Sequence, residues 1–156
     1  MWGKFVVRVC VRGSVTAMQP LSAAEAEYLP ISSDSDIEGR VGSLIGRARG
    51  RSLWMLFLTT EDIQLPLMIP LADYPSCPGP ESAAQLGFAL RQSVDVAGAA
   101  KVVLVWERCQ GRNLTATDKA WARAAVEACR HARVPLRAQL VSHREGIRWL
   151  APDDCL

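Results

Sequence analysis

The hydrophobic and polar positions of the chain repeat with two different periods. The shorter period, of two residues, predicts strands. Alternation with a period of two predicts strands over residues 4–11 and 63–71. Residues 52–58 and 101–106 are apolar on both faces, which predicts strands in the interior of a sheet. Two prolines interrupt the 63–71 segment. Because proline cannot donate to a strand ladder, we expect this strand to lie at a sheet edge or to be irregular.

Apolar residues at steps of three and four predict amphipathic helices between these strands. The spacing predicts one helix from residue 37 to residue 48, a second over residues 81–96 and a third after Thr115. A glycine follows the second helix and a proline follows the third, and both are typical stop signals. The third helix is expected to turn inward a set of small and apolar side chains: Ala122, Ala125, Val126, Cys129 and Ala132.

Two further elements are expected outside these regular segments. A capping-box spacing from Ser22 to Glu25 predicts a short helix that ends at Pro30. Residues 136–142 and 146–150 are two strand-like runs separated by a short polar turn, which predicts a closing hairpin. The chain is therefore expected to end in paired strands.

The order of the elements predicts an α/β fold with three layers. From residue 37 the chain runs helix, strand, strand, helix, strand, helix, strand, strand, which indicates a mixed sheet of about five to six strands flanked by helices. A chain of 156 residues has the size of one domain. We therefore expect a single domain over residues 1–156, with a strand and loop extension over 1–35 and a core over 36–150.

The composition narrows the classes of protein that the chain can belong to. It is 49% hydrophobic and 22% charged, which is typical of a globular domain. No apolar run approaches the roughly 18 residues that a membrane span needs, so we expect no membrane association and a cytoplasmic location. Five scattered cysteines form no Cys-x-x-Cys pair, which favours free thiols and predicts neither a metal site nor a cofactor.

The positive charge of the chain is carried almost entirely by arginine. Arg47, Arg49 and Arg51 lie close together in sequence, and Arg108 and Arg112 lie in the loop after the central strand. If the fold brings them together, they form one basic surface suited to anions or nucleic acid. The alternative is that arginine replaces lysine through a GC-rich coding bias, which the absence of any block of five like charges favours.

The loop after the central strand is where an α/β fold usually places its site, and it holds candidate catalytic groups. Glu107 offers an acid or base, Cys109 a thiol, and Asp118 a carboxylate at the start of the next helix. A cysteine nucleophile needs a histidine or another cation to hold it as the thiolate, and only arginines are near in sequence. The alternative is an exposed polar loop with a non-catalytic thiol.

The strand, loop and helix over residues 101–134, with the element order from residue 36 onward, resemble the RadC-like branch of the JAB/JAMM domains. In that family a strand ends in His-x-His-Pro-Ser-Gly, and Ser-x-x-Asp opens the next helix. Two histidines and the aspartate hold zinc. Gly111 matches the motif glycine, Thr115 the serine and Asp118 the aspartate, with one residue fewer in the loop. The resemblance covers about residues 36–150 and implies a cytidine-deaminase-like or JAB-like architecture.

The histidine positions of that motif are occupied here by Trp106 and Arg108. Neither can replace imidazole as a zinc ligand, because indole offers only an N–H and guanidinium stays protonated. The resemblance therefore implies that the zinc site has been lost. Asp118 also has a simpler explanation as a helix-start residue favoured by the helix dipole.

Three functions follow from these features. The first is a non-catalytic RadC/JAB-like interaction or scaffold module, a pseudoenzyme with an unidentified protein partner and with nucleic acid as a further candidate partner. The second is a metal-independent hydrolase or transferase that uses Glu107, Cys109 and Asp118. The third is a DNA- or RNA-binding protein without sequence preference. The sequence also leaves homo-oligomerisation open.

Overall fold

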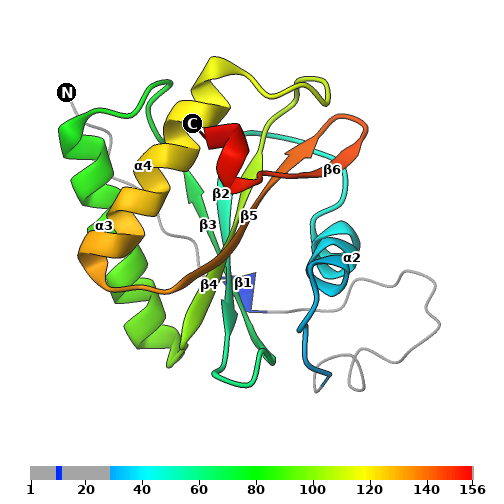
Figure 1. The fold of residues 1–156 in the computed structure, drawn as a ribbon, viewed down its shortest axis with the longest axis vertical. Coiled ribbons are helices and arrows are strands. Elements are labelled where there is room, and N and C mark those ends of the chain that lie inside the picture. The colour runs from blue at the N-terminus through cyan, green and yellow to red at the C-terminus, as the bar shows by residue number, and fades with distance from the viewer. Residues whose placement is uncertain (1–9, 12–28, 156) are drawn as a thin grey trace.

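The computed structural model describes residues 10–11 and 29–155, and it shows a mixed sheet between two layers of helices (Figure 1). Of the strand expected over residues 4–11, only β1 (Cys10–Val11) is described, and the short helix expected before Pro30 lies outside the described residues. The other strands are β2 (Ser52–Leu58), β3 (Gln64–Ala72), β4 (Lys101–Glu107), β5 (Leu136–His143) and β6 (Gly146–Trp149). The helices are α2 (Asp34–Leu44), α3 (Pro80–Ala97), α4 (Ala116–Ala132) and the 3₁₀ turn η1 (Pro152–Cys155).

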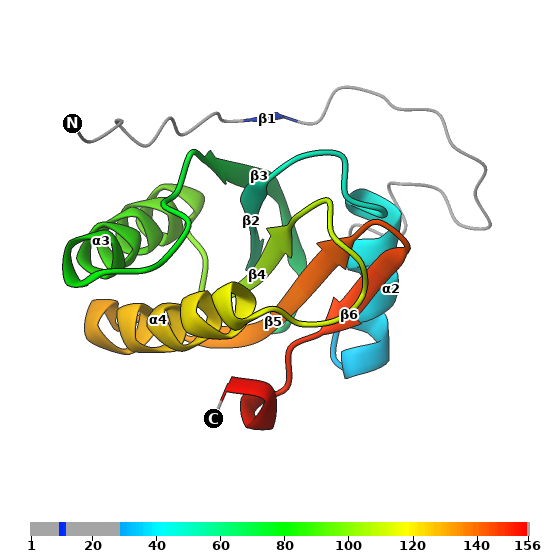
Figure 2. The same ribbon diagram turned by 90° about the horizontal axis from the view of Figure 1, so that it is seen from above.

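The sheet has the strand order β1-β3-β2-β4-β5-β6. Strands β4 and β5 pair in parallel, and every other neighbouring pair is antiparallel. Seen from above, α2 covers one face of the sheet, and α3 and α4 cover the other (Figure 2). The expected three-layer α/β fold with a mixed sheet is confirmed. Within the described residues, no helix has the length and apolar character needed to span a bilayer.

The apolar runs of β2 and β4 form the centre of the core, because their alternate side chains enter both layers. On the side of α3 and α4, the buried residues include Met55, Phe57 and Leu104. On the side of α2, Leu56 and Val103 pack against that helix. The prediction that 52–58 and 101–106 are interior strands is therefore confirmed.

Strand β3 shows why its two prolines are tolerated. It pairs with β2 along its length, but on its other side it pairs within the described residues only with the two-residue β1. The register also shifts between Leu56 and Leu58. The strand is thus both nearly at the edge and irregular, as the prolines predicted.

The helix boundaries follow from their caps. Ser33 caps α2, with Asp36 N donating to its Oγ over 3.1 Å and its own N donating to Asp36 Oδ2 over 3.1 Å. Gly98 closes α3 in the left-handed conformation at φ 63°, as a glycine stop signal predicts. Because Ile31 is buried in the core and α2 begins at Asp34, the boundary expected at residue 36 falls inside a helix.

One expected core position of α4 is wrong. Val126 is 45% exposed, while Trp121, which was not among the predicted inward residues, is buried. The inner face of α4 is therefore centred on Trp121, Ala122, Ala125 and Cys129 rather than on the side that carries Val126.

The topology brings four loops to one end of the sheet. Ser52 at the start of β2 pairs with Ala72 at the end of β3 and with Glu107 at the end of β4. Glu107 in turn pairs with Ser142 near the end of β5. The segments 45–51, 73–79, 108–115 and 144–145 consequently surround the carboxyl end of β4, which lies at the top of Figure 1.

Candidate functional site

A cavity of about 230 Å³ opens at the carboxyl end of β4, beside the start of α4. Trp106, Arg108 and Asp118 all line it, so the three positions compared with the zinc motif converge in one pocket. Trp106 and Arg108 are two residues apart on an extended chain and therefore face the same side of the sheet, toward α4. The intervening Glu107 points to the other side.

Arg108 and Asp118 form a buried ion pair with several hydrogen bonds. Arg108 Nε lies 2.9 Å from both carboxylate oxygens of Asp118, and Nη2 lies 2.9 Å from Oδ2. Each side chain is only 7% exposed. The guanidinium also donates to the carbonyls of Gly111 (2.7 Å) and Asn113 (2.8 Å), so it holds the loop against α4. Charge-assisted, multiply bonded pairs of this kind are the geometrically specific ones.

The local sequence places Asp118 for this contact. Thr115 caps α4, with its Oγ1 accepting from Asp118 N over 3.1 Å, and Thr115 N donates to Asp118 Oδ2 over 2.7 Å. Thr115 and Asp118 thus form a capping box at the start of α4, and the helix expected after Thr115 is confirmed. The same carboxylate thus serves both the helix start and the buried guanidinium, which explains why its burial is tolerated.

Glu107 is held on the opposite face of the sheet. Its Oε1 accepts from Arg49 N (2.7 Å) and Gly50 N (3.2 Å), and its Oε2 accepts from Trp54 Nε1 (2.8 Å). The carboxylate therefore fixes the segment that leads into β2. Cys109 is exposed, and its thiol donates to the carbonyl of Gly50 over 3.6 Å. The structure does not bring Glu107 and Asp118 together, and their assignment with Cys109 as catalytic residues stays a prediction.

Three aromatic rings form the floor beside the ion pair. Tyr74 lies 5.5 Å from Trp106 and 5.4 Å from Trp121, both edge-to-face, and the two tryptophans lie 5.7 Å apart between centroids. The Arg51 guanidinium stacks on Tyr74 at 3.9 Å and donates to the Tyr74 carbonyl. Burial raises the pKa of Tyr74, and the hydroxyl is therefore neutral at pH 7.

The sequence predictions missed Tyr74 and Trp121. Trp121 lies three residues after Asp118 on the same helical face, which is a signal that could have found it. Tyr74 lies in a proline-rich loop, where no periodic pattern indicates burial. Its position depends on Arg51 and on the two tryptophans, which come from other segments.

The five arginines predicted to share a surface separate into two groups. Arg47, Arg49 and Arg112 are exposed at the carboxyl end of β4, and Arg51, although exposed, is tied to Tyr74 and Pro75. Arg108 is buried, so its expected place on an exposed basic surface is wrong. Its burial follows from the Asp118 carboxylate and the loop carbonyls, which replace water around the guanidinium.

Two further arginines reach this end from the β5–β6 hairpin. Arg144 N donates to the carbonyl of Gln110 over 3.0 Å, and Arg148 Nη1 donates to the carbonyl of Arg112 over 3.2 Å. We call the five arginines around this end the arginine rim: Arg47, Arg49, Arg112, Arg144 and Arg148. Sequence reasoning missed the last two because they are isolated charges on a hairpin, and only the fold places them beside the loop.

His143 is buried beside the rim, and the charges around it affect its pKa. Burial lowers the pKa of His143 below its ordinary value, and the nearby cations Arg108, Arg112 and Arg148 lower it further against the opposing effect of Glu145. Its Nδ1 accepts from Glu145 N over 3.2 Å, which places the proton of the neutral ring on Nε2. The ring is therefore neutral at pH 7.

The donor groups in the pocket do not fit a zinc ion. Trp106 Nε1 donates to Gln139 Oε1 over 2.9 Å, and the Arg108 guanidinium donates to Asp118, so neither offers a lone pair. Within residues 29–155 no three His, Cys, Asp or Glu side chains gather as a metal-binding group. No family model matches the chain, and no curated protein shows significant sequence similarity to it.

Proposed function

We propose that the chain is a non-catalytic interaction module with a RadC/JAB-like architecture and a lost metal site. The observation that carries the proposal is the Arg108–Asp118 ion pair. The carboxylate that the resemblance equates with a zinc ligand is bonded to a guanidinium carried by the residue at a zinc-ligand position. A positive charge thus lies against this carboxylate without a metal.

The arrangement of the other polar groups favours this proposal over an enzyme. A general acid or base needs a carboxylate that can exchange a proton with a substrate, and a nucleophile needs a base within hydrogen-bond reach. Glu107 is engaged by two backbone amides and an indole, and Asp118 by a guanidinium and an amide. Both carboxylates stabilise loops, and they lie on opposite faces of β4.

Restoring the histidines tests the lost-site proposal. Purified wild-type protein should contain far less than one zinc per chain by elemental analysis. The double variant Trp106→His, Arg108→His should bind zinc in isothermal titration, since the two imidazoles and Asp118 would supply three ligands of a tetrahedral site. Gln139, the present partner of Trp106 Nε1, is placed to accept the second N–H of an imidazole at position 106.

A matched control separates this site from adventitious binding. Adding Asp118→Asn to the double variant removes the carboxylate ligand and should abolish the tight zinc binding, with circular dichroism confirming that both variants are folded. Stoichiometric zinc in the wild-type protein would overturn the proposal. A folded double variant with zinc affinity equal to that of the wild type would remove the RadC/JAB-like interpretation of the pocket.

A further inference from the structure

Among the residues that the structure describes, the arginine rim carries positive charge that no ion pair neutralises. Within residues 10–11 and 29–155, no carboxylate lies within ion-pair distance of Arg47, Arg49, Arg112 or Arg144. The chain as a whole carries a net charge of only +2. The positive charge of the rim therefore reflects where the arginines lie and not an overall excess of basic residues. Two exposed carboxylates, Glu145 at the tip of the same hairpin and Glu38 on α2, share a hollow with Arg47, and the five arginines of the rim outnumber them.

The backbone around the rim is fixed by hydrogen bonds between segments that are distant in sequence. Ala48 N donates to the carbonyl of His143 over 3.0 Å, and Ser142 Oγ donates to the carbonyl of Gly46 over 2.7 Å. Arg108 N donates to the carbonyl of Ser142 over 3.0 Å, which joins the loop after β4 to the end of β5. The backbones of the three segments that carry the arginines are therefore fixed to one another. Little backbone entropy is lost when a ligand binds.

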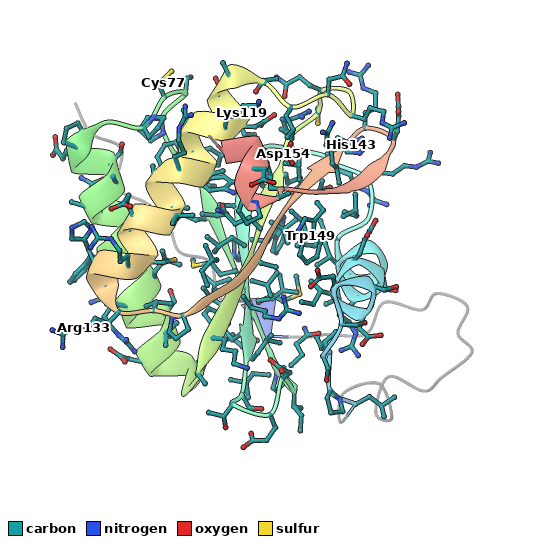
Figure 3. The ribbon with its side chains drawn as sticks, in the orientation of Figure 1. Cys77, Lys119, Arg133, His143, Trp149 and Asp154 are labelled. Carbon is teal, nitrogen blue, oxygen red and sulfur yellow. The ribbon has the colours of Figure 1, made fainter. Side chains whose placement is uncertain are left out.

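A buried side chain lies beside this positive charge. The pKa of His143 is lowered first by burial and then by Arg108, with smaller lowering effects of Arg112 and Arg148 against the opposing effect of Glu145. Figure 3 places His143 at this end of the sheet, whereas Arg133 lies at the far end of α4. Arg130 and Arg133 thus provide arginines of the same protein outside the rim.

The chemistry of the rim favours a phosphate backbone over other anionic partners. Guanidinium is planar and binds phosphate oxygens bidentately, and the rim contains no lysine. A membrane surface or an amphipathic peptide would also need apolar side chains beside the charges. The large exposed hydrophobic residues among those described, Leu29, Phe88, Val96 and Val126, lie outside the rim segments.

We propose that the arginine rim binds the phosphate backbone of nucleic acid without reading its sequence. This rests on the proposed function, because it gives the non-catalytic module its partner class. Arg47, Arg49, Arg112, Arg144 and Arg148 contact phosphates, and the loops at the carboxyl end of β4 face the strand. Because the contacts go to phosphates, affinity depends on salt and hardly on sequence.

Fluorescence anisotropy with labelled DNA of about 20 nucleotides, single-stranded and duplex, tests the proposal. Each phosphate neutralised contributes about −0.9 to the slope of log K against log salt for duplex DNA, so a slope of about −3 to −4 is expected for a rim that engages about four phosphates. The double variant Arg112→Gln, Arg144→Gln should bind at least about tenfold more weakly and lose about 2 from the slope.

The matched control is Arg130→Gln, Arg133→Gln, which removes the same charge from the opposite end of the molecule. It should change the affinity less than about twofold, because exposed charges beyond a Debye length of the ligand are screened. Equal losses in the two double variants would overturn the rim assignment, as would absence of binding at about 50 mM salt. Binding of polyglutamate or of phosphatidylserine vesicles as tight as that of DNA would also overturn the assignment to nucleic acid.

The DNA and zinc experiments distinguish failure of the rim proposal from failure of the proposed function. Absence of DNA binding in a zinc-free protein removes the rim proposal and leaves the non-catalytic module in place. Stoichiometric zinc in a protein that still binds DNA through Arg112 and Arg144 removes the proposed function and leaves the rim.

Discussion

Strand β4 has an ion pair beside each of its ends, and the two pairs differ in what surrounds them. At its start, Lys101 Nζ lies 2.7 Å from Asp62 Oδ1, with side chains 28% and 24% exposed. After its end, Arg108 and Asp118 are each 7% exposed and are bonded to further backbone groups. The first pair lies partly in water and ties down a hairpin turn. The second is enclosed and organises a pocket.

This difference locates the specialised end of the molecule. A partly exposed lysine pair contributes little to stability, and most surfaces carry such pairs. A buried arginine pair costs desolvation and persists only with many compensating hydrogen bonds. These compensating hydrogen bonds lie at the end of the sheet where the pocket and the arginine rim also lie. The comparison therefore supports placing the function of the chain there.

The largest effect is expected from breaking the enclosed pair. Asp118→Asn leaves the Arg108 guanidinium buried without a counter-charge, which should lower the free energy of unfolding by about 3–5 kcal/mol. The matched change at the other end, Asp62→Asn, should cost less than about 1 kcal/mol. Asp62 has a φ of 62°, a conformation that asparagine also tolerates, so backbone strain does not confuse the comparison.

Urea denaturation of the two variants measures both values. Replacing both partners in Arg108→Met, Asp118→Leu should recover only part of the loss, because it removes the buried charges but leaves Thr115 N and the carbonyls of Gly111 and Asn113 without their partners. Equal destabilisation by Asp118→Asn and Asp62→Asn would contradict the contrast between the two ends.

The contrast between the two ends also separates what the sequence could predict from what it could not. The strands and helices depend largely on residues close together in sequence, so periodicity and capping patterns located α3, α4 and the interior strands. The helix expected over residues 37–48 is instead Asp34–Leu44, because Ser33 caps it three residues earlier. The burial of Arg108 depends on Asp118 in the next helix and on carbonyls of the loop between them. A pattern of single residues treats an arginine in a polar loop as exposed, and it therefore predicted a surface group.

For the same reason, the sequence alone could predict only some of the arginines of the rim. Arg47, Arg49 and Arg112 were predicted because they lie in clusters or in the candidate loop. Arg144 and Arg148 join them because β5 runs parallel to β4 and its hairpin therefore turns at the same end of the sheet. Long-range strand pairing, and not local sequence, determines which charges become neighbours.

A second effect, of intermediate size, is expected at Glu107. Glu107→Gln keeps one carbonyl oxygen for the amides of Arg49 and Gly50 but loses the charge-assisted bonds, including the one from Trp54 Nε1. We expect the free energy of unfolding to fall by about 1–3 kcal/mol, less than for Asp118→Asn. Thermal denaturation measures it, with Glu127→Gln on the exposed face of α4 as a control that leaves the midpoint unchanged. A catalytic Glu107 without a structural role would instead leave stability unaffected.

The smallest effect is expected from the protonation of His143, and it sharpens the comparison by reporting the field at the carboxyl end. Its pKa is lower in the folded chain than the ordinary value of 6.5, through burial and then through Arg108, with Arg112 and Arg148 acting in the same direction and Glu145 against them. The unfolded chain therefore binds the proton more readily. This contribution to stability is fully present above about pH 6.5 and is lost as the pH falls through the folded-state pKa, with a slope below the single-proton limit of about 1.4 kcal/mol per pH unit.

Urea denaturation at pH 7 and at pH 5 measures the change in the free energy of unfolding. In His143→Asn, which retains an acceptor for Glu145 N, the part of the pH dependence due to this ring should disappear. In Arg112→Gln it should shrink, because one of the cations that oppose protonation has gone. An unchanged pH dependence in His143→Asn would show that other groups produce it. An unchanged dependence in Arg112→Gln would show that the rim does not act on the ring.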